Sequence, residues 1–236
     1  MDALQKFSVP LSIVVAGAFI AGALYYGGNG GNPGGQVAAP AAAVDIKDVK
    51  INMTDPVVGD KNAPVTLAYW FDYQCPFCKA VDVGGIPQIP IEPSLPTLIK
   101  DYVETGKLKI VFKDYAFLGP DSTTAALYMH AVWDLYPDKF YDWHEAMFIA
   151  QDEEHAGFGN EESILALSAK IPGLDADKLK QQVASKREAY TALIGANQQE
   201  GASFGIQGTP GFITGTTLIP GAEQLSTFKA AIDAQL

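Results

Sequence analysis

Short apolar runs and longer amphipathic segments follow one another along most of the chain. Residues 65–71 form a β-branched and aromatic run, and residues 107–113 alternate between apolar and polar side chains. Both patterns are typical of strands, and the first is typical of a buried one. Residues 211–214 and 217–219 predict two further short strands around a turn at Gly215. Strands are therefore expected early and late in the folded sequence.

Helix-forming segments occupy most of the sequence between and after these strands. Residues 122–147 and 161–203 carry apolar side chains at three- and four-residue spacings, and a Pro-Gly pair at 172–173 interrupts the second block. Residues 222–235 predict a terminal helix. The resulting order of elements is that of an α/β domain interrupted by a helical insertion.

An uncharged stretch near the N-terminus, residues 8–26, differs from all of these elements. At about 1.5 Å per residue it comes close to spanning the roughly 30 Å hydrocarbon core of a bilayer. A cleaved signal peptide is the alternative, but its apolar core is usually shorter, about 7–15 residues, and its cleavage site closer. The small residues at 41–43 offer such a site only far downstream. We therefore expect an uncleaved, single transmembrane helix.

The chain is thus predicted to have three parts. Residues 1–26 form an N-terminal membrane anchor or uncleaved signal, and residues 27–43, rich in Gly, Pro and Ala and without charge, form a flexible linker. Residues 44–236 form the folded domain, with the helical insertion at about residues 120–204.

Charge and cysteine content narrow the chemistry. The net charge of −11 argues against nucleic acid as a partner, because nucleic acid requires a basic face. The two cysteines of the chain, Cys75 and Cys78, lie three positions apart. A disulfide across two intervening residues closes almost no loop and adds little stability. Structural zinc generally needs four ligands, and the histidines lie at no suitable spacing from the cysteines. We expect a redox pair, with no metal and no other cofactor.

The Cys75-Pro76-Phe77-Cys78 motif follows the first predicted strand, where a helix is expected to begin. Unpaired N–H groups and the dipole at a helix start favour a thiolate, so Cys75 is predicted to be the nucleophile. Cys78, one turn inside the helix, is predicted to be buried and to resolve the mixed disulfide. Pro76 presets the first helical turn, and Phe77 shelters the sulfur without a charge or donor of its own. Pro76 and Phe77 are therefore expected to tune the site.

Several motifs, in order, resemble the DsbA-like branch of the thioredoxin superfamily, and the resemblance spans about residues 55–236. It implies a thioredoxin-like α/β fold with an inserted helical subdomain, and disulfide exchange on exported proteins. The stretches that carry the resemblance are residues 62–66, 71–79, 105–114, 139–144 and 205–212.

The same resemblance implies that Thr209–Pro210 is a cis peptide bond facing Cys75. An X–Pro bond adopts cis at a low free-energy cost, and the exposed backbone of Thr209 is then expected to pair with an extended substrate. Taken alone, the glycine-rich sequence around Pro210 also fits an ordinary turn with a trans bond.

The chain departs from its relatives beneath the cysteines. Relatives often place a buried acidic residue six positions before the first cysteine, where this chain has Tyr69. We expect no other carboxylate to substitute, since Asp72 lies at the strand end, so deprotonation of Cys78 would depend on water or a distant group. His144 is expected to be a packed core residue and not a general base.

A second departure is the segment at residues 84–96. Relatives tend to be helical here, but four prolines forbid an uninterrupted helix. The active-site helix is therefore expected to be kinked or split.

The function that these observations favour is a disulfide-forming oxidase, anchored in a membrane with its domain extracytoplasmic, either periplasmic or at the cell surface. Its expected partners are unfolded or reduced exported proteins and a membrane or envelope redox partner that recycles the cysteines. A reductase or isomerase is the alternative within the same chemistry. A non-catalytic binding module with an inert disulfide is the alternative outside it.

Overall fold

The computed structural model describes residues 44–153 and 156–236. The predicted anchor (residues 1–26) and linker (residues 27–43) lie outside these residues and stay predictions. Across the described part of the chain, no helix combines the length and the apolar character needed to cross a bilayer.

A mixed five-stranded sheet forms the centre of the domain. Its strands lie in the order β1-β3-β2-β4-β5, with β2 parallel to β3 and the other neighbours antiparallel. All four predicted strands are present, whereas β1 was not predicted because two valines are too short a run to show a period. The strands are β1 (Val57–Val58), β2 (Val65–Phe71), β3 (Leu108–Asp114), β4 (Gly211–Thr214) and β5 (Thr217–Pro220).

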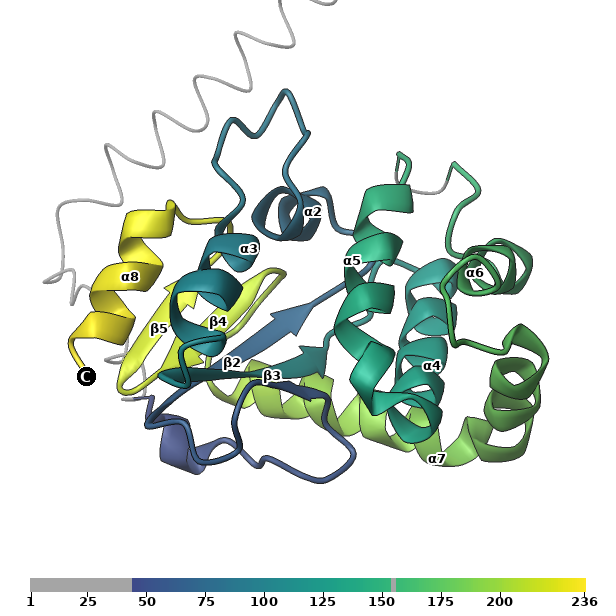
Figure 1. The fold of residues 1–236 in the computed structure, drawn as a ribbon, viewed down its shortest axis with the longest axis horizontal. Coiled ribbons are helices and arrows are strands. Elements are labelled where there is room, and N and C mark those ends of the chain that lie inside the picture. Colours follow the sequence, from purple (N-terminus) through teal and green to yellow (C-terminus); the bar gives the residue numbers. More distant parts are fainter. Residues whose placement is uncertain (1–43, 154–155) are drawn as a thin grey trace, which may run out of the picture. The chain divides into compact units, whose positions relative to one another are not determined.

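Helices cover both faces of this sheet. In Figure 1, α2, α3 and α8 lie over one face, while the long α7 runs along the other. The helices are α2 (Pro76–Asp82), α3 (Ser94–Leu98), α4 (Pro120–Leu135), α5 (Phe140–Ala150), α6 (Glu161–Ser168), α7 (Ala176–Ser203) and α8 (Leu225–Asp233).

Alternation along β2 divides the core between the two faces. Tyr69 and Phe71 belong to the larger core cluster, on the face that α2 covers. Ala68 and Trp70 belong to a smaller cluster on the other face, where the Trp70 indole donates to the Asn197 carbonyl of α7 at 3.1 Å. A central strand buried on both faces explains why the run 65–71 is apolar throughout.

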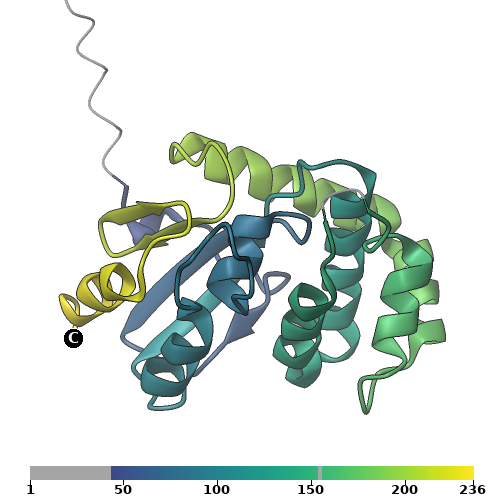
Figure 2. The ribbon, with the colours of Figure 1, turned by 90° about the horizontal axis from the view of Figure 1, so that it is seen from above.

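The predicted helical insertion is present as α4 to α7, between β3 and β4. Figure 2 shows these helices grouped beside the sheet, with α7 extending from the group along it. Asn160 and Asp175 cap α6 and α7 by accepting hydrogen bonds from backbone N–H groups three residues on. The expected single block 122–147 is instead two helices, because Pro137 starts a new 3-10 turn after α4.

The proline-rich segment splits the active-site helix, as predicted. Helix α2 ends at Asp82, and Gly84 then adopts a left-handed φ of 71° while its N–H bonds the Lys79 carbonyl. The loop that follows projects between α2 and α3 in Figure 1, and α3 begins only at Ser94.

Candidate active site

Cys75 lies at the junction of β2 and α2. Its backbone is extended (φ −79°, ψ 120°) and Pro76 takes the first helical position, so the chain turns into the helix directly beneath the Cys75 sulfur. Both cysteines are free thiols. Cys75 keeps 4% of its surface exposed and Cys78 none, so Cys75 is the less buried residue of the pair.

The two thiols have different proton affinities. A hydrogen bond from the Cys78 thiol, with further help from the N–H groups at the helix start, lowers the pKa of Cys75 to about 7 against the effect of burial. Burial, followed by the neighbouring Cys75, raises the pKa of Cys78 well above its usual value. The pair can therefore hold a thiolate at Cys75 while Cys78 stays protonated.

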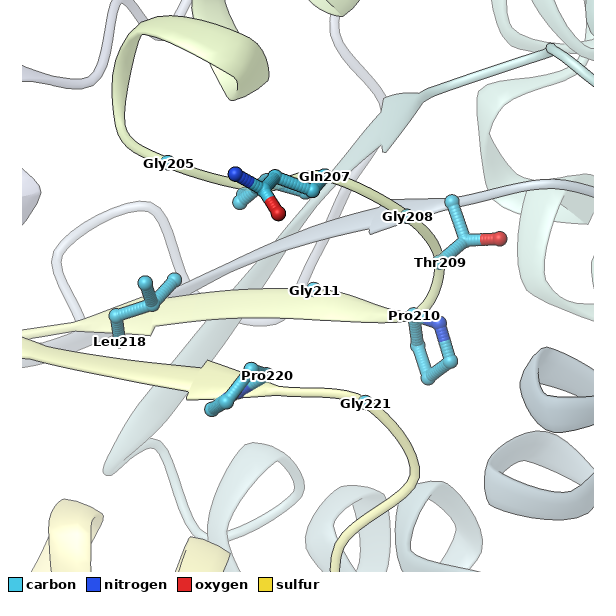
Figure 3. Close-up of a pocket in the computed structure, with 10 residues that line it drawn as sticks. Gly205, Gln207, Gly208, Thr209, Pro210, Gly211, Leu218, Pro220 and Gly221 are labelled. Carbon is cyan, nitrogen blue, oxygen red and sulfur yellow. The ribbon is translucent and has the colours of Figure 1, made fainter. Parts of the chain in front are cut away.

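The Thr209–Pro210 bond is cis, as the resemblance implied, and it lies beside the first cysteine. The Cys75 thiol donates to the Thr209 carbonyl at 3.3 Å. Figure 3 shows Thr209 and Pro210 at one end of a pocket of about 380 Å³ that continues past Gly211 toward Leu218. An extended chain entering this pocket would therefore pass close to the reactive sulfur.

Two polar side chains hold the loop that precedes Cys75. The Gln151 amide, at the end of α5, donates to the carbonyls of Tyr73 at 2.6 Å and Cys75 at 3.1 Å. Asp72 is buried and accepts hydrogen bonds from three backbone N–H groups, those of Gln74, Phe117 and Leu118. Sequence analysis did not single out Gln151, which lies 76 positions from Cys75 and has no local motif around it.

Phe77 lies at the surface of the site. Its side chain is 49% exposed, one of the more exposed large apolar residues of the described chain. Its expected sheltering of the sulfur, and the tuning by Pro76, stay predictions.

The helix that carries Cys78 also carries a buried carboxylate that the sequence analysis did not single out, and the expectation that none substitutes for the relatives' acid stays a prediction. Asp82, one helical turn after Cys78, is 2% exposed. It accepts from the Tyr69 hydroxyl at 2.6 Å and pairs with Nε2 of His144 at 2.7 Å. His144 is packed among aromatic rings as expected, but both of its nitrogens are hydrogen-bonded, the second to Tyr73 at 2.9 Å. The i, i+4 spacing of Cys78 and Asp82, which puts them on one helix face, was the available signal.

Comparison with known proteins agrees with this geometry. The sequence model of the family described as thioredoxin matches residues 51–234. The chain belongs to the thioredoxin family. Over 181 residues, 77% of each chain, this thioredoxin-family protein is 26% identical to disulfide bond formation protein D of Bacillus subtilis.

Solved structures point the same way. BdbD of Bacillus subtilis, in its oxidised form, is similar with a TM-score of 0.68 and 25% identity, over 82% of this chain and 97% of that one. The thiol-disulfide exchange protein α-DsbA2 of Wolbachia pipientis is similar with a TM-score of 0.65 and 27% identity, over 78% and 88% of the two chains. This thioredoxin-family chain is a DsbA-like protein disulfide oxidoreductase.

Proposed function

We propose that this oxidoreductase donates a Cys75–Cys78 disulfide to reduced proteins outside the cytoplasm. The observation that carries the proposal is the state of Cys75: it is the less buried residue of the pair, it caps the start of α2, and the pKa of its thiol is about 7. A sulfur of that kind is a good attacking and leaving group at neutral pH. The disulfide-forming direction is supported by the similarity to disulfide bond formation protein D.

Each step of the exchange has a residue suited to it. A client thiolate attacks Sγ of Cys75, the bond to Cys78 breaks, and its electron pair leaves on Cys78, which takes up a proton. A second client thiolate then attacks the client sulfur of the mixed disulfide and releases Cys75 as a thiolate. The client backbone lies in an extended form along Thr209 and Pro210, within the pocket of Figure 3.

The N-terminal region sets the place of action in this proposal. Residues 1–26 anchor the protein, residues 27–43 tether it, and the domain faces an oxidising compartment, periplasmic or cell-surface. A membrane or envelope redox partner then restores the disulfide. The similarity to disulfide bond formation protein D is consistent with a compartment in which disulfides form.

Trapping clients tests the exchange. Full-length Cys78→Ser protein keeps the Cys75 thiolate, which can attack a client disulfide to form a mixed disulfide, the reverse of the steps above. It lacks the Cys78 thiol that would then displace the client, so we expect it to accumulate in cells as disulfide-linked complexes with exported, cysteine-containing proteins. These complexes should be separated by a reductant and absent from the Cys75→Ser, Cys78→Ser double variant. An equal yield of complexes from the double variant would contradict the roles given to the two thiols.

The reduction potential tests the direction, because pKa does not set it alone: the reactive cysteine of thioredoxin also has a pKa of about 7. The protonated Cys78 thiol stabilises the Cys75 thiolate and hence the reduced form, which makes the disulfide more oxidising. Equilibration with glutathione buffers should give a potential above roughly −230 mV. A potential near the thioredoxin value of about −270 mV would make this protein a reductase.

A further inference from the structure

Four buried side chains form a continuous hydrogen-bonded row behind the cysteine pair. The Tyr69 hydroxyl reaches Oδ2 of Asp82, Oδ1 of Asp82 reaches Nε2 of His144, and Nδ1 of His144 reaches the Tyr73 hydroxyl, at 2.6, 2.7 and 2.9 Å. All four residues are at most 2% exposed. The row joins β2, α2 and α5 in one network.

One assignment of protons satisfies every member of the row. Asp82 is an ionised carboxylate that accepts twice, from the Tyr69 O–H and from an Nε2–H of neutral His144. The free Nδ1 of His144 then accepts from the Tyr73 O–H. In this assignment the network holds a buried base, the Asp82–His144 pair, at the end of a phenol that can pass a proton.

The exchange reaction needs such a base. When the pair is re-oxidised, Cys78 must lose its proton to attack the disulfide on Cys75, yet it is fully buried and burial raises its pKa. Cys78 and Asp82 lie one turn apart on α2, and Tyr69, whose hydroxyl bonds Asp82 at 2.6 Å, belongs with Cys78 to the larger core cluster. The phenol of Tyr69 therefore lies against the part of α2 that carries both Cys78 and Asp82, and the Cys78 sulfur, after burial and the Asp82 charge, contributes to raising the pKa of that phenol.

We propose that Tyr69 and Asp82 carry the proton of Cys78 and that His144 positions Asp82 for this role. As the S–H bond of Cys78 breaks, its proton passes to the Tyr69 oxygen while the Tyr69 proton passes to Oδ2 of Asp82. The electron pair left on Cys78 attacks Sγ of Cys75, and the outgoing thiol leaves as a thiolate with the electron pair of the broken S–S bond. When Cys78 is itself the leaving group, the same path returns a proton to it.

Other ionisable groups near the site are less suited to this role. Asp72 already accepts from three backbone N–H groups, which hold it at the end of β2. Tyr141, on α5, has its pKa raised by burial, then by the charges of Asp82 and Glu145, so it stays a protonated phenol and offers the row no base. The Asp82–His144 pair is the base that the contacts of Tyr69 reach directly.

The test isolates the Cys78 step and uses oxidised glutathione as the probe, so it stands independently of any client protein. Reduced full-length protein is mixed with the probe, quenched with acid at intervals, and its mixed disulfide with glutathione is quantified by mass. Tyr69→Phe keeps the ring stacked on Phe212 and removes only the hydroxyl. We expect it to slow resolution of the mixed disulfide about 100-fold at pH 7, the low end of what a positioned acid or base contributes.

Two further readouts separate a relay from a structural role. In Tyr69→Phe the resolution rate should rise about tenfold per pH unit, following the small thiolate fraction of Cys78, whereas the wild-type rate should depend weakly on pH near neutrality. Formation of the mixed disulfide, which uses Cys75, should stay within about twofold of wild type, since the relay serves the other thiol. Asp82→Asn should behave like Tyr69→Phe if it folds.

The matched control is Tyr102→Phe, which removes a phenol-to-aspartate hydrogen bond of 2.8 Å to Asp233, outside the row. It should change neither step. If Tyr69→Phe resolves the mixed disulfide with glutathione at the wild-type rate and with the wild-type pH profile, the proposal is overturned. Equal slowing of both steps would overturn it as well, because that result indicates a structural role.

Discussion

Asp72 shows how a single buried carboxylate holds the site in place. Its two oxygens accept the N–H groups of Gln74, Phe117 and Leu118 at 2.9, 2.9 and 3.1 Å, so it ties the turn before Cys75 to the loop after β3. Asp72 is 1% exposed, and this burial raises the pKa of its carboxyl. These hydrogen bonds compensate for its removal from solvent.

Asp72→Ala should destabilise the domain by about 2–4 kcal/mol, because three backbone donors lose their acceptor in a buried place. Urea unfolding of the reduced protein measures this as a lower midpoint at an unchanged slope. The control is Asp142→Ala, whose exposed carboxylate pairs with Lys139 at 3.2 Å and should contribute less than about 1 kcal/mol. Equal midpoints for the two variants would contradict the role given to Asp72.

At the residue scale, site residues that lie close together in the sequence could be predicted, whereas those that folding brings together from distant positions could not. The Cys75–Cys78 pair was readable because the spacing itself defines the motif, and Pro210 because the resemblance covers its loop. The contact of Asp82 with His144 joins residues 62 positions apart, and only packing of α5 on α2 brings them together. In the sequence, an aspartate and a histidine that pair in the core look the same as a surface aspartate and an unrelated core histidine.

Element-scale patterning was most reliable where a strand is buried on both sides. The bounds of β2 agree with the predicted run because its β-branched and aromatic residues end at Asp72. The alternation of apolar and polar residues at 107–113 suggests that the Lys113 side chain points to solvent, but the structure shows otherwise. Lys113 is completely buried, and its ammonium lies 2.8 Å from Asp55 and 3.2 Å from Glu200 of α7. The two-residue alternation of a strand does not tell whether a lysine is solvated or is buried in an ion pair.

Lys113→Met should therefore destabilise the domain by about 3–5 kcal/mol, because it leaves the Asp55 carboxylate buried without its cation. Thermal or urea unfolding measures the loss. Lys109→Met is the matched control on the same strand, since its ammonium bonds the Lys61 carbonyl near the surface. A variant at position 113 as stable as this control would show that the ion pair contributes little.

At the scale of the whole molecule, the site lies where the two parts of the domain meet. The first cysteine begins α2, the Gln151 that holds its carbonyl ends α5 in the helical insertion, and Thr209 comes from the loop that leads into β4. Helix α7 joins these parts, since it packs on α4 and also passes the sheet closely at Gly201, where a Cβ would meet the Trp70 ring at 2.9 Å.

This arrangement accounts for the limits of prediction at that scale. The order of motifs along the chain implied the thioredoxin-like fold and the insertion, because each motif corresponds to one strand, helix or loop of that fold. The closeness of α5 to the cysteine turn has no local signature, so the part that Gln151 plays became visible only in the structure.

The central claim is that Cys75 carries a thiolate at neutral pH because the Cys78 thiol donates to it and a helix begins at it. The most direct test is the rate at which iodoacetamide alkylates Cys75 in the reduced, native protein, followed by peptide mass from pH 5 to 10. Only the thiolate reacts, so the rate should rise with pH to a midpoint of about 7. A midpoint at or above about 8.5, the value of an ordinary free cysteine, would contradict the account, as would a native Cys75 that resists alkylation altogether.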